Sequence, residues 1–395
     1  MYRAGQEEIA EISKVILSKQ WFRVGSDNSN HLREVERFEE EWAALLKVPY
    51  ALLMCGGGTA ALVCALAGAG IGPGDEVIVP AYTWMATATS VLTVGAIPVL
   101  VDIDETMGLD PIEFEKKISG QTKAVIPVHM SGRASNLEAI IAIAQKHKIK
   151  VIEDSCQMDG GTYKGKRTGT WGDAGAFSFN FYKIISSGGE GGCLVTKNRE
   201  IYERAFVYHD SGASFRPKAN ELTTPVFVAQ QYRADEVMGA IARIQMKRMD
   251  AIIRDLRKNR SILEGAVKNS KNVSMAPSND PDGDCGIVLS LKFPSEAMAR
   301  KFATAPDVGG LVTIDHGKHV YTNWEPLRKK RISHHPDMNP FFFEKNRGLR
   351  TDYSDSACPR TIEILRHTVY ITINPDWTEE EINKKYLSMQ KASEF

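Results

Sequence analysis

Short apolar runs alternate with helical patterns between residues 50 and 154. The expected strands are 50–54, 76–79, 98–101, 123–128 and 150–152, and the expected helices include 60–69, 83–94 and 136–147. This alternation predicts an α/β fold with a mostly parallel sheet and helices on both faces. Ligands gather at the carboxyl ends of the strands in such sheets. Residues that closely follow a strand are therefore candidates for a functional site.

One lysine follows an aromatic run. Residues 176–181 (AFSFNF) predict a buried strand, because aromatic residues dominate and no helical period is present. Lys183 then enters a turn rich in Gly and Ser. Burying an unpaired ammonium is costly, and desolvation frees the amine to act as a nucleophile. The alternative is an ordinary lysine that extends its charge into solvent beside a turn.

A glycine-rich loop follows the first strand and opens a helix. Residues 56–60 read Gly-Gly-Gly-Thr-Ala, and the free N–H groups of such a helix start form a phosphate-binding site. A simple glycine turn is the alternative. A second glycine pattern, at 160–166, resembles a P-loop but continues with Arg167 where Ser or Thr is needed. We expect a turn between short strands there.

Glu153 and Asp154 end the strand at 150–152. A buried carboxylate needs a partner, either a lysine or arginine in a salt bridge or a protonated ring nitrogen of a cofactor. Trp84 also lies close to a strand end, where it belongs either to the core or to a stacking surface. A phosphate cradle, a carboxylate at a strand end and Lys183 together fit pyridoxal phosphate.

Composition excludes several other classes. The 395 residues are 43% hydrophobic, and 49 acidic residues balance 49 basic ones, so charge gives no argument for nucleic acid or an anionic membrane. No apolar stretch approaches the roughly 20 residues of a membrane span, and the first residues lack the apolar core of a signal peptide. Six scattered cysteines indicate reduced thiols, so we expect a cytoplasmic protein.

Histidines do not predict a metal site. The segment that carries His316 and His319 has no cysteine close by, and Lys318 between the two histidines would repel a cation. We expect no metal.

The domain organisation follows from the longer patterns. Helices are expected at 5–18 and 31–47, with a loop at 20–30, and a long polar connection at 209–231 predicts a lid or an inter-subunit arm. A helix over 235–267 predicts a bridge between two domains. We therefore expect a large cofactor-binding domain at 1–245 and a small α+β domain at 246–395.

Five segments in a fixed order resemble the DegT/StrS family of sugar aminotransferases. They are 72–80 (GPGDEVIVP), 153–157 (EDSCQ), 163–166 (YKGK), 177–183 (FSFNFYK) and 189–192 (GEGG). The resemblance covers about residues 5 to 380. It implies the aspartate-aminotransferase (type I) fold, pyridoxal 5'-phosphate as cofactor, and a homodimer whose active sites lie at the interface.

The resemblance also implies roles for single residues. Lys183 would be the Schiff-base lysine and Asp154 the partner of the pyridinium nitrogen. Gln157 would lie near the ring hydroxyl and Trp84 against the ring. Ser178 would bind the phosphate together with Gly58, Thr59 and Ala60. In the family an asparagine of the second subunit often contacts this phosphate in an Asn-Tyr-Arg sequence; here Gln231 takes its place, before Tyr232 and Arg233.

The implied reaction is ping-pong amino transfer. Glutamate or glutamine donates an amino group, a keto or aldehyde sugar accepts it, and Lys183 moves protons. A branch of the family carries histidine instead of the lysine and removes a sugar hydroxyl, so Lys183 favours amination over a pyridoxal-phosphate-dependent sugar dehydratase. A sugar sensor without activity is a third interpretation.

Two segments, 184–192 and 317–324, are most similar to family members that aminate 8-oxo-3-deoxy-manno-octulosonate, giving 8-amino-3,8-dideoxy-manno-octulosonate for lipopolysaccharide. A cationic pocket would suit the carboxylate of this acceptor, with Arg233, His316, Lys318 and His319 as candidates. These four could equally be ordinary surface charges. A nucleotide-linked 3- or 4-keto sugar and an inosose are the alternative acceptors.

Overall fold

A computed structural model describes residues 3–25, 30–217 and 219–394; part of the loop expected at 20–30 lies outside them. Its main feature is a seven-stranded sheet with the strand order β1-β9-β8-β5-β4-β2-β3. β9 is antiparallel to both neighbours, and the other described pairs are parallel, so the sheet is mostly parallel as predicted. The strands are β1 (Tyr50–Met54), β2 (Glu76–Pro80), β3 (Ile97–Val101), β4 (Thr122–Val125), β5 (Lys150–Asp154), β8 (Ala174–Ser178) and β9 (Gly192–Thr196).

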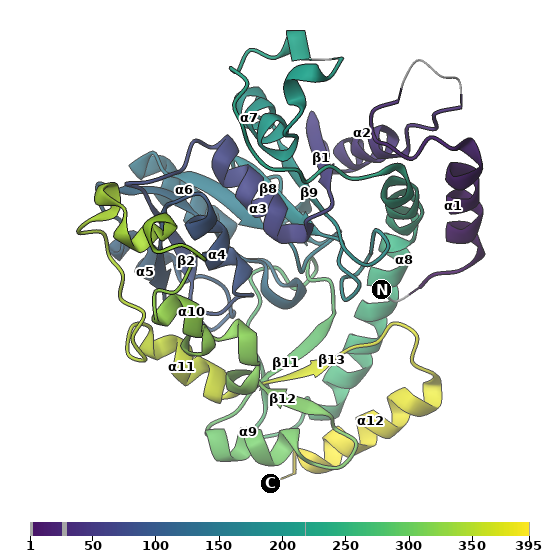
Figure 1. Ribbon diagram of the computed structural model, residues 1–395. Helices are drawn as coiled ribbons and strands as arrows, with labels where there is room; N and C mark the ends of the chain where they lie inside the picture. The colour runs from purple at the N-terminus through teal and green to yellow at the C-terminus, as the bar shows by residue number, and fades with distance from the viewer. Residues whose placement is uncertain (1–2, 26–29, 218, 395) are drawn as a thin grey trace.

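Helices cover both faces of this sheet (Figure 1). Neighbouring residues of a strand point to opposite faces, so Leu52 packs in a cluster with α3 and α7 while Leu53 packs with α2 and α8. A third cluster joins β2, β3 and β4 to α5 and α6. The helices of this part are α1 (Gln6–Ser18), α2 (Glu34–Leu46), α3 (Gly57–Gly68), α4 (Ala86–Thr93), α5 (Pro111–Lys116), α6 (Leu137–His147) and α7 (Arg199–His209).

A smaller sheet lies at the lower end of the molecule in Figure 1. Its order is β10-β11-β13-β12, and all its pairs are antiparallel. The strands are β10 (Ser274–Met275), β11 (Val288–Lys292), β12 (Gly310–Val312) and β13 (Thr368–Thr372), and the helices around them are α9 (Glu296–Ala303), α11 (Pro359–Arg366) and α12 (Glu379–Ala392).

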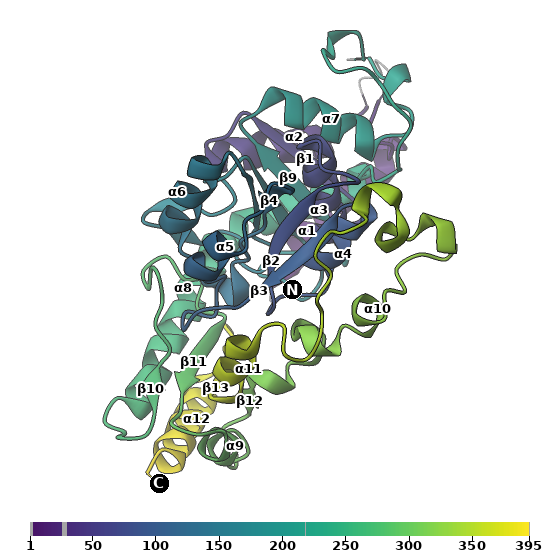
Figure 2. The ribbon, with the colours of Figure 1, turned by 90° about the vertical axis from the view of Figure 1, so that its left-hand side faces the viewer.

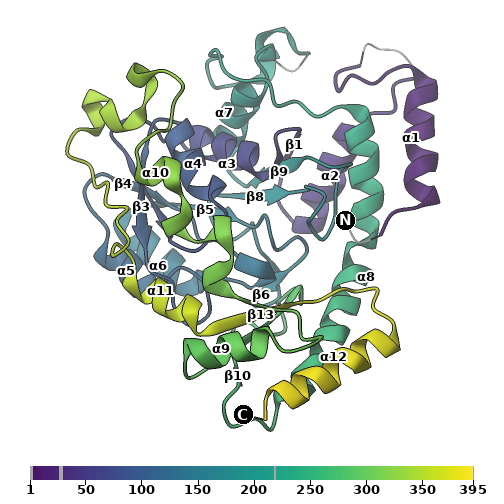
Figure 3. The same ribbon diagram turned by 60° about the horizontal axis from the view of Figure 1, so that its bottom comes forward.

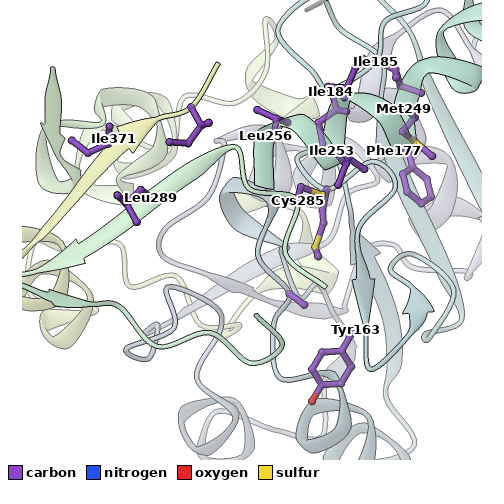
Figure 4. Packing of buried hydrophobic residues seen from close by; sticks show 14 of the residues in the cluster. Tyr163, Phe177, Ile184, Ile185, Met249, Ile253, Leu256, Cys285, Leu289 and Ile371 are labelled. Carbon is purple, nitrogen blue, oxygen red and sulfur yellow. The ribbon is translucent and has the colours of Figure 1, made fainter. Parts of the chain in front are cut away.

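The 32-residue helix α8 (Glu236–Val267) joins the two parts. Figure 3 shows it running from the side of the large sheet to α12. Asp235 caps its start by accepting a hydrogen bond from the Met238 N–H. In Figure 4, Met249, Ile253 and Leu256 lie between residues of the large part and residues of the small sheet, within one buried cluster. α8 is therefore the shared core of both parts. The boundary predicted at 245/246 falls inside it and stays a prediction.

One C-terminal segment packs against the large part. Figure 2 shows the chain around α10 (Glu325–Arg328) beside α4. Three aromatic residues of this segment are buried in the same cluster as Leu62 of α3 and Ile97 of β3. They are Tyr321, Trp324 and Tyr353. This packing brings residues 316–319 to the sheet edge described below.

The structure corrects two expected strands. The strand expected at 123–128 is β4, which ends at Val125. The strand expected at 176–181 runs from Ala174 to Ser178 instead. Beyond Ser178 the backbone bonds to the following loop, because Phe179 N–H donates to Gly191 O and Phe181 N–H to Gly189 O. The turn expected at 160–166 is confirmed, because Lys164 and Gly165 connect the short strands β6 (Thr162–Tyr163) and β7 (Lys166–Arg167). Among the described helices, none is both long and apolar enough to cross a membrane.

Candidate active site

A cavity of about 440 Å³ opens at the carboxyl ends of β1, β2, β4, β5 and β8. Its wall is drawn from loops that are far apart in the sequence. The lining residues are Gly56, Gly57, Gly58, Thr59, Leu62, Thr83, Trp84, Ala86, Val128, Asp154, Cys156, Gln157, Ser178, Asn180, Tyr182, Lys183, Glu190, Lys318 and His319. The strand-end positions singled out in the sequence therefore meet in one place.

The start of α3 forms one end of the cavity. α3 begins at Gly57 directly after the β1 turn, and no side chain caps its first N–H groups. The Cβ of any other residue at 58 would lie 2.4 Å from Cys156 Sγ, so only glycine brings the backbone this close. The hydroxyls of Thr59 and Ser178 line the same end, and neither has a hydrogen-bond partner within the described residues. Free N–H groups and hydroxyls together fit a phosphate.

Asp154 lies at the other side of the cavity and is 5% exposed. Its Oδ2 accepts a hydrogen bond from Thr87 Oγ1 at 2.8 Å, and its Oδ1 accepts one from Cys156 N–H at 3.2 Å. Thr87 in turn is hydrogen-bonded to Thr83 at 2.7 Å. Within the described chain Asp154 forms no ion pair with a lysine or arginine. A buried, oriented carboxylate without a cationic partner fits a protonated ring nitrogen.

The neighbouring Glu153 faces the other side of β5. Its carboxylate accepts hydrogen bonds from the N–H groups of Gly169, Trp171 and Gly172 at 2.6–2.8 Å and from His129 Nε2 at 3.1 Å. His129 Nδ1 accepts from Ser135 N–H, so the ring hydrogen lies on Nε2 and points to Glu153. Glu153 therefore holds the strand end that presents Asp154.

Lys183 lies in the loop between β8 and β9. Its N–H donates to Asn180 O at 2.9 Å, and its half-buried side chain lines the cavity. Its ammonium has no hydrogen bond or ion pair in the described part of the chain. Burial raises the pKa of the Cys156 thiol well above its usual value, the Asp154 charge raises it further, and the Lys183 charge opposes both. The charges of Lys183 and Asp154 therefore both influence the Cys156 thiol, so the two side chains lie close to the same part of the cavity.

Gln157 completes this side. Its Oε1 accepts a hydrogen bond from Ser131 N–H at 2.9 Å, which leaves the side-chain NH₂ group as a donor for a ligand. Ser131 adopts a left-handed backbone conformation with φ of 55°. The side chain of Gln157 is therefore held in place at the cavity wall.

Trp84 forms the outer wall and is 40% exposed. Lys318 Nζ lies 4.3 Å from the centroid of its ring, and the ring of His319 is 5.4 Å away. A ring that is open on one side can stack on a planar ligand. Lys318 and His319 come from the short 3₁₀ turn Gly317–His319, which the C-terminal segment brings to the cavity.

Four predicted site residues do not line this cavity. Ala60 is buried in the core, and its N–H donates to Gly56 O at 3.2 Å, so this N–H is not free for a ligand. Arg233 pairs with Asp210 and lies over the ring of Phe22, and Gln231 is exposed on the strand bridge to Asp210. His316 lies behind His319, where Tyr82 OH contacts its Nδ1 at 2.8 Å. Burial lowers the pKa of His316 to about 4 and that of His319 to about 3, so both rings are neutral near pH 7.

Sequence reasoning missed Thr83, Thr87, Asn180, Tyr182 and Glu190. Asn180 Nδ2 donates to Glu190 Oε1 at 2.9 Å, which ties the two sides of the Lys183 loop together. A signal was available for three of them, since Asn180, Tyr182 and Glu190 lie within the motifs around Lys183. Thr87 carries no motif, because a threonine in a helix is an ordinary residue until its partner is known.

The fold and this cavity define the class of type I pyridoxal phosphate enzymes, in which a lysine, a strand-end carboxylate and a phosphate cradle surround the cofactor. Residues 3–305 match the DegT/DnrJ/EryC1/StrS aminotransferase family. The chain belongs to this family, whose aminotransferases depend on pyridoxal phosphate. The predicted family, enzyme class and cofactor are confirmed.

Two curated relatives align with most of the chain. The chain is 35% identical over 326 residues to the dTDP-3-amino-3,6-dideoxy-alpha-D-galactopyranose transaminase of Aneurinibacillus thermoaerophilus, an alignment that covers 81% of this chain and 85% of that protein. It is 28% identical over 330 residues to the L-glutamine:2-deoxy-scyllo-inosose aminotransferase of Streptomyces lividus, covering 82% and 77%. Alignments with three other curated relatives span 67%, 57% and 62% of their lengths.

The fold is also found in solved structures. An aminotransferase from Psychrobacter cryohalolentis superimposes with a TM-score of 0.80 at 25% identity, covering 99% of this chain and 98% of that one. This likeness confirms the predicted fold class.

Proposed function

We propose that the chain transfers an amino group from glutamate or glutamine to the carbonyl carbon of a sugar. The observation that carries this proposal is the single cavity that contains Lys183, Asp154 and the α3 start. Family membership supports the reaction class. Pyridoxal phosphate supplies an electron sink at the reacting carbon.

The residues of the cavity suggest a division of roles. Gly58, Thr59 and Ser178 would hold the phosphate, and Asp154 would keep the ring nitrogen protonated. Trp84 and Gln157 would orient the ring. Lys183, whose amine has no other partner in the described chain, would bind the cofactor and then move a proton to and from the substrate carbon.

A homodimer with shared sites fits the surface around the cavity. Tyr182, which lines the cavity, is 84% exposed, and Phe215 and Val228 on the 209–231 connection are 86% and 96% exposed. Apolar side chains this exposed commonly lie at subunit contacts. In this proposal Gln231, which is exposed and outside its own cavity, completes the phosphate site of a second copy.

For the acceptor we propose 8-oxo-3-deoxy-manno-octulosonate. Support comes from the resemblance of segments 184–192 and 317–324 and from Lys318, whose ammonium lies at the cavity wall where it would bind a carboxylate. His316 and His319 do not add positive charge there near pH 7. A dTDP-linked 3-keto sugar and 2-deoxy-scyllo-inosose are the alternatives that the names of the relatives suggest.

The test begins with the visible spectrum of the purified protein loaded with pyridoxal phosphate. We expect a yellow absorption band that glutamate bleaches, and no such band for Lys183→Ala. A band that Lys183→Ala leaves unchanged would refute the role of the lysine.

The three acceptors are then supplied to the glutamate-treated enzyme. Return of the yellow band with an amino sugar as product supports the transferase. A deoxy sugar and water in place of the amino sugar would support the dehydratase instead.

A further inference from the structure

The 3₁₀ turn Gly317–His319 carries two side chains into the cavity, and they have different chemistry. The ammonium of Lys318 lies over the ring of Trp84. His319 lies at the same wall with its ring 3.9 Å from the ring of His316, the two planes stacked at 26°. His316 is in turn fixed by its contact with Tyr82 OH, and Tyr82 is fully buried. The position of the His319 ring is therefore set from behind by a buried column of rings.

The hydrogen-bonding pattern determines which nitrogen of His319 carries the proton. Nδ1 lies 3.2 Å from the backbone oxygen of His316. A carbonyl oxygen only accepts hydrogen bonds, so Nδ1 must be the donor. In the neutral ring Nε2 is then a free acceptor. It has no hydrogen-bond partner within residues 3–25, 30–217 and 219–394.

Geometry also keeps this ring neutral. Two protonated imidazoles stacked at 3.9 Å would repel each other. The charges of His316, Lys183 and Lys318 all lower the pKa of His319. The two carboxylates that line the cavity, Asp154 and Glu190, form no hydrogen bond or ion pair with His319 within the described residues. Burial is the largest influence, and it lowers the pKa of His319 in the same direction.

We propose that His319 Nε2 accepts a hydrogen bond from a hydroxyl group of the acceptor sugar. This inference rests on the proposed function and sharpens it. Lys318 is the cation of the Gly317–His319 turn and would bind an anionic group of the acceptor. His319 would instead favour an acceptor that carries hydroxyl groups. An anionic acceptor without a hydroxyl near the carboxylate would lose this contact. The site would then reject it, because a bound molecule that covers Nε2 without pairing it leaves an unpaired acceptor cut off from water, which is costly.

The experiment compares His319→Phe, which keeps a stacking ring but removes the acceptor, with His319→Gln, whose side-chain oxygen reaches a similar position. His334→Phe is the matched control, because His334 is exposed and has no interaction within the described residues. The loaded enzymes are measured in two half-reactions: with glutamate, and with 8-oxo-3-deoxy-manno-octulosonate, a dTDP-linked 3-keto sugar or 2-deoxy-scyllo-inosose.

We expect His319→Phe to lower kcat/KM for the acceptor by about 10- to 100-fold, and His319→Gln by less than about 5-fold. The glutamate half-reaction and the His334→Phe enzyme should stay within about 3-fold of the unchanged protein. Between pH 6 and 8 the loss should be constant, because a neutral His319 does not titrate there.

Three results would overturn the proposal. Equal losses in His319→Phe and His319→Gln would assign His319 a purely structural role. A loss of the same size in the glutamate half-reaction would show that His319 contacts the cofactor and not the acceptor sugar. A loss confined to the acidic end of the pH range would show that a protonated ring binds an anion. If the unchanged protein fails to react with glutamate, the proposed function itself fails, a result distinct from all three.

Discussion

Glu153 and Asp154 are adjacent carboxylates with different tasks. Successive residues of a strand point to opposite faces, so Asp154 reaches the cavity while Glu153 is fully buried beneath it. Glu153 accepts three backbone hydrogen bonds and one from His129. Glu153 therefore stabilises the end of the strand, whereas Asp154 is available to bind a ligand.

Glu153→Gln should therefore destabilise the protein. The glutamine side chain offers one acceptor oxygen and turns its NH₂ group toward backbone donors, so at least one buried N–H loses its partner. We expect a loss of about 1–3 kcal/mol in the free energy of unfolding, measured by urea denaturation. Glu138→Gln is the control, because Glu138 pairs with Lys164 at the surface; it should change stability by less than about 1 kcal/mol. Equal effects of the two changes would contradict this account.

Asp210 predicts a pH dependence. Burial alone would raise its pKa, but hydrogen bonds from Arg216, the Gly212 N–H and Arg233 outweigh burial and lower it to about 2. A depressed carboxyl pKa gives stability that is present above the unfolded value near 4 and is lost as the pH falls toward 2. Asp210→Asn should thus cost stability at pH 7, and its difference from the unchanged protein should shrink between pH 4 and 2. Urea midpoints across this range provide the measurement; a difference that grows on acidification would refute the argument.

At the scale of elements, the backbone at the start of α3 packs closely against the side chains of Cys156 and Ser178. The cradle needs the N–H groups of α3 next to Ser178, and Cys156 fills the space behind Gly58. A methyl group at 58 has no room unless the sulfur moves.

We expect Gly58→Ala to weaken pyridoxal phosphate binding at least about 10-fold, because the helix start must shift away from Ser178. The double change Gly58→Ala with Cys156→Ala should recover part of the affinity, since it removes the sulfur that lies 2.4 Å from the added Cβ. Cofactor titration followed by absorbance measures both. No recovery in the double variant would show that Cys156 is not the obstacle.

The elements themselves were largely predictable, and the contacts between distant elements were not. Strand ends near 54, 80 and 154 follow from apolar runs that stop before a glycine-rich loop, at Pro80 and at a pair of carboxylates. The places of Gly58, Trp84 and Asp154 could therefore be predicted. The hydrogen bond from Thr87 to Asp154 depends on how α4 packs on the sheet. The neutral state of His319 depends on its burial in a wall that it shares with Trp84, a residue from a distant part of the chain.

At the scale of the whole molecule, each cavity contains Lys183 and Asp154 of one chain, whereas Gln231 of that chain lies outside it. If two copies share their sites as proposed, Gln231 and Lys183 of one chain serve different sites. Two inactive variants can then form an active hybrid dimer, provided that one variant is defective at a residue of its own cavity and the other at the residue that it contributes to its partner's cavity.

Lys183→Ala and Gln231→Glu test this division. The first lacks the lysine, and the second brings a negative charge to the phosphate, so each homodimer should be inactive. The two variants are unfolded together and refolded as a mixture. About half of the dimers that form are then hybrids, and each hybrid has one intact site out of two. We therefore expect about a quarter of the full aminotransferase activity. Lys183→Ala mixed with Asp154→Asn is the control: both defects lie in one cavity of one chain, so a hybrid has no intact site and activity should stay absent. Activity in the control, or none in the first mixture when hybrids are present, would show that Gln231 does not complete the site of the second copy.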